Sequence, residues 1–308
     1  MSHPPSDSTR LVVGPLEAGE RIDRFLASMS SLSRRGARAL LRQSSVLRNG
    51  KILRIEGRIL EFGDVVDVHL PPDQLEAPRT PALPTVDLVH QDGWVLAANK
   101  PAGTLSQPSE RRQEGELALD EQLALQLAVQ RGRPPFLRLI HRLDRVTSGL
   151  LLFAADRRAL APLAAAWRSR DVGRTYLAVV EGSLEVEKQH IEAPIAKARG
   201  GGWKFEVSSL GQESETEVTT LASNPDFSLV KCQLVTGRTH QVRVHLAHLG
   251  FPVLGDRLYG SRSKSASRPL LHASELSLPH PRSGEQLRLH CPAPEDFTPF
   301  TEATTVAT

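Results

Sequence analysis

Cysteine is scarce in this chain of 308 residues, which contains only Cys232 and Cys291. Two cysteines without metal-ligand spacing exclude a disulfide framework and a thiolate zinc site, and they fit a reducing compartment. Long apolar runs are also missing, because no window approaches about 18 consecutive apolar residues. The first ten residues are polar and contain proline, so they do not resemble a secretory signal. We therefore expect a cytoplasmic protein without a membrane span, and a monomer by default.

Acidic residues are nearly absent from one stretch. Residues 31–60 contain eight Lys or Arg and a single acid, Glu56, although the whole chain has a net charge of only +3. This concentration of positive charge indicates an N-terminal surface that binds a polyanion such as RNA. A charged face that serves only solubility is the alternative. Hydrophobic residues make up 40% of the chain, which is enough to bury a core in one large domain and one small domain.

The patterns divide the chain into five segments. We predict a disordered tail at 1–16, a small basic RNA-binding domain at 17–71, a proline-rich linker at 72–85, a large domain at 86–291 and a second tail at 292–308. In the large domain, short strand signals outnumber helices, although residues 117–129 have a helical pattern. This favours an α+β fold built on a mixed, largely antiparallel sheet.

The small domain has two helix signals followed by a hairpin. A helix begins near Arg21, and Ser33 is placed to cap a second helix. Within this second helix, three arginines recur every four residues and share one face: Arg34, Arg38 and Arg42. The Asn49–Gly50 pair predicts a tight turn before Lys51, and residues 65–70 alternate as a strand. The arginine face and Lys51 are candidates for contacts with an RNA backbone.

The most informative segment is HRLDRVTSGLLLFA, residues 141–154. Asp144 lies between Arg142 and Arg145, in positive potential that favours an ionised carboxylate able to attack an electrophile. The turn residues after it lead into an apolar run that predicts a strand buried on both faces. The alternative is an aspartate that only closes its own turn.

Other candidates stand at the ends of predicted elements. Lys100 ends a predicted strand, where the alternative is a residue that only forms a hairpin corner. Tyr176 lies in a strand where its ring could stack on a base or belong to the core. Arg238 and Arg243 bracket a helix-like run rich in histidine, which includes His240. No carboxylate lies among these histidines and no HExxH pattern occurs, so we expect no metal site; packing on the helix or contact with RNA is the interpretation we favour.

Four segments together resemble the RluA family of pseudouridine synthases. They are HRLDRVTSGLLLFA, RTYLAVVEG, GRTHQVRVHLAHLGFPVLGDRLYG and LLHASELSLPHP, in the family's order and approximate spacing over nearly all of residues 86–291. SRRGARALLRQSSVLRNGKI followed by GDVVDVHL resembles the small RNA-binding module of ribosomal protein S4. Departures from the family pattern are Val146 for an acid, Phe251 for a histidine, Arg257 for a proline, and a polar loop after Lys100.

The resemblance implies roles for particular residues. Asp144 would be the nucleophile, Arg243 its ion-pair partner, and Tyr176 the residue that stacks on the target base and assists proton movement. Arg142 would enter the space vacated by the flipped nucleotide. The full set of proposed RNA contacts is Arg142, Arg34, Arg38, Arg42, Lys51, Lys100, Arg238 and His240.

The predicted activity is therefore isomerisation of specific uridines in structured RNA, ribosomal RNA rather than transfer RNA, with no cofactor and no metal. Two alternatives remain at this point. One is a non-catalytic RNA-binding or ribosome-assembly protein on the same fold, in which Asp144 only forms a turn. The other is a metal-dependent RNA hydrolase that uses the histidine-rich segment.

Overall fold

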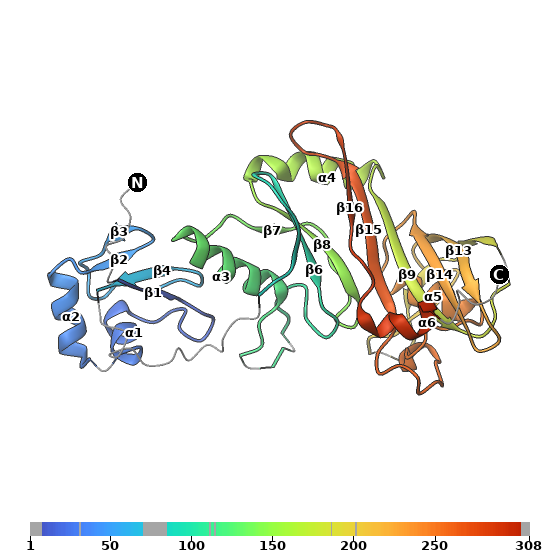
Figure 1. Cartoon of the computed structure of the whole chain (residues 1–308), viewed down its shortest axis with the longest axis horizontal. Coiled ribbons are helices and arrows are strands. Elements are labelled where there is room, and N and C mark those ends of the chain that lie inside the picture. The colour runs from blue at the N-terminus through green and yellow to red at the C-terminus, as the bar shows by residue number, and fades with distance from the viewer. Residues whose placement is uncertain are drawn as a thin grey trace. The chain divides into compact units, whose positions relative to one another are not determined.

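The computed structural model describes residues 8–30, 32–69, 85–110, 112–113, 115–185, 187–200 and 202–302. The described residues form two compact units, coloured along the chain in Figure 1. The small unit comprises the chain up to Val86 together with residues 107–137, and the large unit comprises residues 87–106 and the chain from Arg138 onward. The prediction of one continuous large domain at 86–291 is therefore corrected, because residues 107–137 belong to the small unit. The predicted linker lies outside the described residues except for residue 85.

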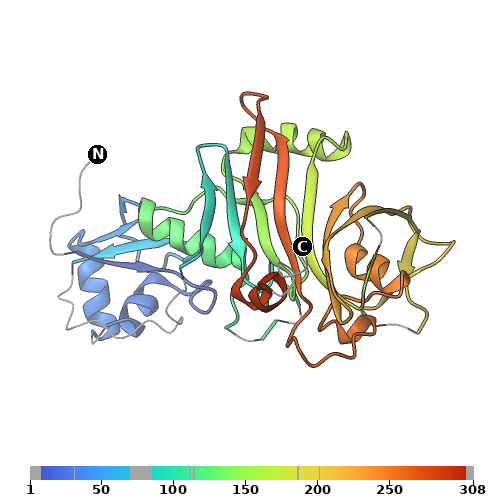
Figure 2. The ribbon, with the colours of Figure 1, turned by 45° about the vertical axis from the view of Figure 1, so that its right-hand side comes forward.

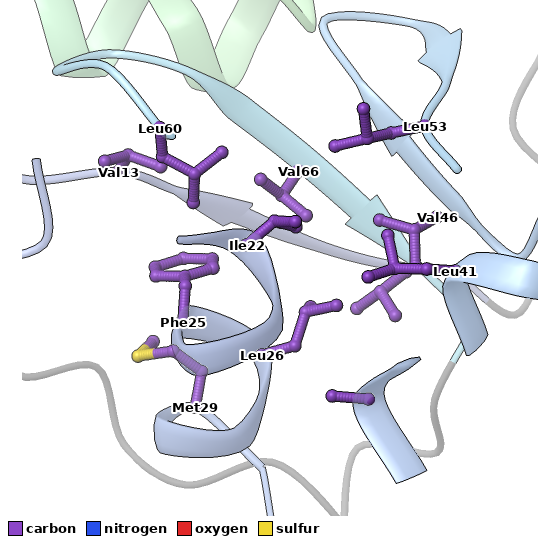
Figure 3. Packing of buried hydrophobic residues seen from close by; sticks show 12 residues of the cluster. Val13, Ile22, Phe25, Leu26, Met29, Leu41, Val46, Leu53, Leu60 and Val66 are labelled. Carbon is purple, nitrogen blue, oxygen red and sulfur yellow. The ribbon is translucent and has the colours of Figure 1, made fainter. Parts of the chain in front are cut away.

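The small unit is a four-stranded antiparallel sheet covered by helices. The sheet has the order β1-β4-β2-β3. Figure 3 shows its core, where Phe25 and Leu26 of the first helix lie against Val66 and Leu60. The elements are β1 (Thr9–Val12), α1 (Ile22–Ser28), α2 (Arg34–Arg42), β2 (Val46–Arg48), β3 (Lys51–Ile52), β4 (Val65–Val68) and α3 (Leu119–Arg131).

Local sequence signals explain where α2 begins and where the chain turns between β2 and β3. The Ser33 side chain accepts a hydrogen bond from the Gly36 backbone N–H, which confirms the predicted cap of α2. Asn49 and Gly50 both have positive φ, 52° and 76°, as a type I′ hairpin turn requires. The Asn49 side chain also bonds Asp64 and the Val65 N–H, so the turn is tied to β4.

Two predictions for the N-terminal half are wrong. Residues 1–16 were predicted as a tail, but Thr9–Val12 form β1 and pair antiparallel with β4. The helix predicted at 117–129 is present as α3, but it packs on β1 rather than in the large domain. Arg10 of β1 donates to the Val129 carbonyl of α3 at 3.1 Å. The strand was missed because only four residues pair, and their register depends on β4.

The large unit is built on one long mixed sheet with the order β10-β13-β14-β9-β15-β8-β6-β5, to which β16 and β7 add at β15 and β8. Every pairing is antiparallel except that of β15 with β8, so the predicted fold class is confirmed. Its strands are β5 (Leu88–Gln91), β6 (Val95–Lys100), β7 (Arg138–Leu139), β8 (Ser148–Ala154), β9 (Gly173–Glu181), β10 (Lys188–Glu192), β13 (Glu215–Ser223), β14 (Phe227–Leu234), β15 (Leu271–Pro279) and β16 (Gln286–His290). A separate two-stranded sheet is formed by β11 (Ile195–Lys197) and β12 (Phe205–Val207).

Helices cover parts of this sheet. Figure 2 shows α5 lying against the curved half formed by β13 and β14, where its apolar residues Val242 and Leu246 join the core. The helices and short 3-10 segments are η2 (Arg157–Ala159), α4 (Leu160–Arg168), α5 (Gln241–His248), η3 (Arg257–Tyr259), η4 (Glu295–Phe297) and α6 (Thr298–Glu302). Among the described residues no helix combines the length and apolarity needed to cross a membrane.

The strand predicted after Asp144 is confirmed. All residues of β8 are buried, as expected for a strand covered on both faces. β8 runs parallel to β15 at Gly149, which has φ of 114°, and a Cβ there would lie 2.3 Å from the Ala273 carbonyl oxygen. Only glycine permits this approach, and it fixes the start of β8 directly after the Asp144 turn.

The C-terminal segment is not the tail that was predicted for residues 292–308. Phe297 and Phe300 are buried against Val179 and Leu254 in a core cluster of the large unit. Residues 303–308 lie outside the described range. The two helices of this segment, η4 and α6, together span only residues 295–302. Helices this short leave no hydrophobic periodicity in the sequence, so the sequence gave no indication that the segment is ordered.

Candidate active site

Asp144 lies in the loop of residues 141–147, here called the Asp144 loop, which connects β7 to β8. The Asp144 carbonyl accepts the Thr147 N–H at 3.0 Å, which closes the predicted turn. The segment after β6 holds this loop from one side. The Gly103 N–H donates to the Arg145 carbonyl at 2.7 Å, and the Ser106 hydroxyl bonds both backbone groups of Leu143. The backbone on each side of Asp144 is thus fixed before any substrate binds.

Lys100 belongs to this support and not to an RNA-binding surface, which corrects the prediction. Its side chain is fully buried, and its ammonium donates to the carbonyls of Pro101, Thr104 and Arg145 at 3.0, 2.8 and 3.2 Å. Burial lowers the pKa of Lys100 to about 7, although the nearby charge of Asp144 acts in the opposite direction. Lys100 therefore ties the end of β6 to the Asp144 loop.

Arg243 of α5 forms ion pairs with two carboxylates, those of Asp144 and Asp256. Its Nη1 donates to Asp144 Oδ2 at 3.1 Å, while Nε and Nη2 bind both oxygens of Asp256 at 2.6 and 2.9 Å. Arg243 and Asp256 are both buried, and Asp144 is 26% exposed at the side chain. The predicted pair of Asp144 with Arg243 is brought together across 99 residues of sequence.

The charge balance keeps Arg243 protonated. Burial lowers the pKa of its guanidinium, but hydrogen bonds and charge from Asp256, with a smaller contribution from Asp144, outweigh burial and raise the pKa above its ordinary value. Because Asp256 takes two of the donors, Arg243 offers Asp144 a single hydrogen bond. Asp144 Oδ1 accepts no hydrogen bond from the described part of the chain and stays available to a substrate.

His240 approaches the same carboxylate from the start of α5. Its Nε2 lies 3.6 Å from Asp144 Oδ2, and its Nδ1 lies 2.7 Å from the Tyr259 hydroxyl. That hydroxyl accepts the Phe205 N–H, so it is free to donate to His240 Nδ1. His240 has φ of 57°, a conformation that costs a non-glycine residue energy and is common at functional sites. Burial lowers the pKa of His240, which favours the neutral ring.

Tyr176 of β9 and Asp144 line one small cavity of about 70 Å³, here called the catalytic cavity, together with Arg142, His240 and Arg243. Burial raises the pKa of Tyr176 to about 12, with the charge of Asp144 adding to the rise, so its phenol is neutral at physiological pH. All three residues predicted as catalytic thus surround one cavity. Arg142 is exposed at its edge, and Arg238 lines it as well.

The predicted RNA contacts of the small unit lie on α2 and β3. Arg34 and Arg38 both bind Asp23 of α1, at 3.2 and 2.9 Å, and Arg42 binds Glu56 at 2.8 Å. Burial alone would raise the pKa of Asp23, but the hydrogen bonds and charge of its arginine partners outweigh it and lower the pKa. The arginine face predicted from spacing therefore exists, with part of its charge balanced by two acids. Lys51 is exposed on β3.

Three residues of the site were not selected from the sequence. Asp256 anchors Arg243, and Tyr259 orients His240, as described above. Gln241 holds the start of α5: its side-chain oxygen accepts from Thr236 and the Arg238 N–H, both at 2.9 Å. The only signal for Asp256 was its place in the Gly255–Asp256 loop, where Gly255 has φ of 82°. A partner 13 residues from Arg243 has no local pattern to reveal it.

The histidines of α5 are packed rather than grouped. His245 is buried and bonds Thr216 and the Ala193 carbonyl, both at 2.9 Å, which is the packing role favoured by the sequence. Among the described residues one group has metal-ligand spacing: His190, Glu192 and Glu215, at an edge of the sheet formed by β10 and β13. It includes no residue of the catalytic cavity.

Comparison with known proteins agrees with this geometry. Residues 95–248 match the RNA pseudouridylate synthase family, and residues 20–66 match the S4 domain. An uncharacterised RNA pseudouridine synthase of Bacillus subtilis is 34% identical over 291 residues, which cover 93% of this chain and 94% of that protein. The ribosomal large subunit pseudouridine synthases C of Vibrio cholerae and Escherichia coli are 35% and 34% identical, with 89% and 91% of this chain and 90% and 91% of those proteins covered.

Solved structures show the same fold. Human RNA Pseudouridylate Synthase Domain Containing 1 aligns with a TM-score of 0.58 and 24% identity over 75% of this chain and 98% of that one. Human RNA Pseudouridylate Synthase Domain Containing 4 aligns with a TM-score of 0.56 and 27% identity over 69% and 90% of the two chains. The sequence matches, which extend over nine-tenths of the chain, agree with the motifs that surround Asp144. The chain belongs to the RNA pseudouridylate synthase family and is an RluA-type RNA pseudouridine synthase with an N-terminal S4 domain.

Proposed function

We propose that this enzyme converts specific uridines of ribosomal RNA to pseudouridine, with Asp144 as its nucleophile. The single observation that carries this assignment is the Asp144 carboxylate at the edge of the catalytic cavity, held through one oxygen by Arg243 with the other oxygen free. Two relatives that match nearly the whole chain are named for the large ribosomal subunit, which favours ribosomal over transfer RNA as the target. From this substrate we infer that the enzyme acts in the cytoplasm.

The isomerisation conserves all atoms and the oxidation state. The bond from uracil N1 to ribose C1′ breaks, a bond from C5 to C1′ forms, the hydrogen on C5 leaves as a proton, and N1 gains a proton. Asp144 acts either by adding to ring carbon 6 or at the ribose, on its anomeric carbon or the proton beside it. No electron acceptor is needed in either route, so the reaction itself requires no redox cofactor.

Arg243 orients this carboxylate without neutralising it. A carboxylate that is fully paired with arginine through both oxygens is a weaker nucleophile. Asp256 prevents that arrangement, because it holds Nε and Nη2 of Arg243 and leaves Nη1 alone for Asp144. The Asp144 carboxylate is therefore fixed in direction while one oxygen remains able to react.

Tyr176 and Arg142 deliver the base. Extruding a stacked uridine costs about a few kcal/mol, and stacking on an aromatic ring returns about 1–3 kcal/mol. Tyr176 lines the catalytic cavity and its phenol stays protonated, so it stacks on the uracil and supplies a hydroxyl for proton movement at C5. Arg142 is exposed beside the cavity and fills the space that the flipped nucleotide leaves.

The remaining basic residues bind the RNA backbone. Arg238 and His240 line the catalytic cavity, and Arg34, Arg38, Arg42 and Lys51 of the small unit add phosphate contacts. Among these three arginines Arg42 contributes most, because its side chain is 72% exposed. Recognition of this kind follows RNA shape and phosphate positions.

Release of tritium tests the nucleophile. Ribosomal RNA transcripts labelled at uridine C5 should lose label to water with the wild-type enzyme, and a chelator should not change the rate. Asp144→Asn should bind the transcript with unchanged Kd and release no label, whereas the control Asp226→Asn, an exposed turn residue, should retain full activity. Full release by Asp144→Asn would refute the site, and loss of activity on chelation would favour a metal-dependent reaction.

A further inference from the structure

A second cavity of about 460 Å³ adjoins the catalytic cavity. The two share five residues in their walls: Arg142, Asp144, Tyr176, Leu234 and Arg238. The second cavity, here called the flanking cavity, extends from there to the C-terminal end of α4, where it is lined by Trp167, Arg168 and Arg170. Its size is within the range of small-molecule sites, whereas the catalytic cavity is several times smaller.

The charge of the flanking cavity is almost entirely positive. Its lining includes five arginines, namely Arg142, Arg168, Arg170, Arg174 and Arg238, and one acid, Asp144. Within the described part of the chain, Arg142, Arg168 and Arg170 form no ion pair or side-chain hydrogen bond. Asp171, the nearest acid in the sequence, accepts the Ser169 hydroxyl instead. Guanidinium groups without carboxylate partners around one cavity fit an anionic ligand.

Arg170 is held in a backbone conformation that favours glycine. It follows the Ser169 C-cap of α4 and has φ of 63°, the left-handed region where helices commonly end on glycine. A residue with a Cβ is disfavoured there. Within the described part of the chain, the Arg170 side chain forms no hydrogen bond that would compensate for this strained backbone. A contact with a ligand would explain why an arginine stands at this position.

Arg174 lines the flanking cavity and carries a buried side-chain donor. Its Nη2 donates to the Thr236 carbonyl at 3.0 Å, but its Nε is buried without a hydrogen-bond partner among the described residues. A Cβ at Gly237 would lie 2.3 Å from Arg174 Nη1, so glycine at that position leaves room for the guanidinium. A buried unpaired N–H is costly, so a small shift of this guanidinium toward an acceptor would be favourable.

One wall of the flanking cavity is aromatic. The rings of Trp167 and His141 stack with centroids 5.4 Å apart and an interplanar angle of 22°. Burial lowers the pKa of His141 to about 4, and its Nε2 accepts the Leu152 N–H at 3.2 Å. His141 is therefore neutral, and the half-buried pair presents flat apolar surface beside the arginines.

We propose that the flanking cavity binds the nucleotide next to the target uridine in the substrate strand, with its phosphate on Arg168 and Arg170 at the C-terminal end of α4 and its base against Trp167. The combination of unpaired guanidinium groups with an aromatic wall matches a phosphate joined to a base, and it adjoins the cavity that takes the uracil. This inference rests on the proposed function, since it takes the catalytic cavity as the site of the target base. It makes Arg170 a residue that fixes the position of the strand, and Trp167 a residue that holds the neighbouring base in place beside the uridine.

A binding experiment with defined probes tests this subsite. The protein carries Asp144→Asn so that the RNA stays unreacted, and the probe is a fluorescent single-stranded RNA with one uridine flanked by five adenosines on each side. Two sister probes lack the base immediately 5′ or immediately 3′ of the uridine. Affinity is measured by fluorescence anisotropy over a range of salt concentrations.

Arg170→Gly should raise Kd about five-fold at low salt and reduce the slope of log Kd against log salt by about 0.7, the value for one phosphate of a single strand. It should not lower Tm, because glycine fits the left-handed backbone. Trp167→Leu should raise Kd for the complete probe and for one sister probe, but not for the probe that lacks the base on the bound side. The control Arg282→Gly, at an exposed position outside the flanking cavity, should change neither quantity.

Equal Kd values for Arg170→Gly and Arg282→Gly would overturn the phosphate contact. Equal losses from Trp167→Leu on all three probes would overturn the base contact. Tritium release by the wild type is a separate measurement. Its absence would refute the proposed function, whereas the comparison of Kd values would still decide whether the flanking cavity binds RNA.

Discussion

Replacing Asp256 with asparagine tests whether Arg243 depends on its second carboxylate. Asp256→Asn keeps the side-chain volume but removes the charge and one acceptor from a bidentate pair at 2.6 and 2.9 Å. Asp256 is 1% exposed and Arg243 is 5% exposed, so water cannot replace the lost interaction. Removing one partner of such a buried pair costs about 3–5 kcal/mol. For a unit of this size we expect Tm to fall by about 6–20 °C.

The same substitution should lower the reaction rate. Without Asp256, the freed donors of Arg243 turn toward Asp144, which becomes a fully paired and weaker nucleophile. We expect kcat for tritium release to fall about tenfold or more while Kd for RNA changes little, since neither oxygen of Asp256 lines the catalytic cavity. Single-turnover rates and anisotropy measure the two quantities separately.

Asp296→Asn is a matched control for stability. Asp296 also binds an arginine through both oxygens, with Arg268 at 2.6 and 2.8 Å, but its side chain is 44% exposed. Solvent screening limits such a pair to about 1 kcal/mol or less. If Asp256→Asn lowered Tm no more than Asp296→Asn, or left kcat unchanged, the two-carboxylate account of Arg243 would be wrong.

Three further predictions follow from the site and the basic surface. Tyr176→Phe should keep RNA affinity, because the ring still stacks, while kcat falls with the lost hydroxyl; equal kcat values would exclude a role for the phenol. Lys100 has a pKa of about 7 in the folded protein against 10.5 ordinarily, so between these pH values the unfolded chain binds more protons and stability rises with pH. Urea denaturation should show that rise in the wild type and a flatter profile in Lys100→Met; identical profiles would refute the burial of a titrating amine. Arg42→Gln with Lys51→Gln should weaken RNA binding and reduce the salt slope by about 0.7–0.9 for each phosphate that the protein no longer neutralises, and an unchanged slope would remove α2 and β3 from the RNA surface.

Local patterns were sufficient for several elements. The Ser33 cap, the Asn49–Gly50 turn and the buried strand after Asp144 each depend on neighbours within a few residues, and each was predicted within its structural bounds. The mixed, largely antiparallel sheet also followed from the density of short strand signals. The pairing of Asp144 with Arg243 was expected only through the family resemblance.

Lys100 shows where local patterns fail. A lysine at the end of a strand is ordinarily exposed, and nothing beside it in the sequence indicates three carbonyl acceptors. One of these acceptors, Arg145, lies 45 residues away. Asp256 was overlooked for the same reason, since its partner is reached only when α5 and the following loop pack together.

The sequence by itself determined the caps, turns, buried strands and motif residues of this protein, because those depend on backbone preferences and periodicity over short spans. The tertiary structure alone decided that Arg243 is shared by two acids, that Lys100 is internal, that α3 packs with the small unit and that the last helix joins the core. The physical reason is that burial and charge pairing are properties of surfaces brought together from distant segments, and no local pattern encodes which surfaces meet.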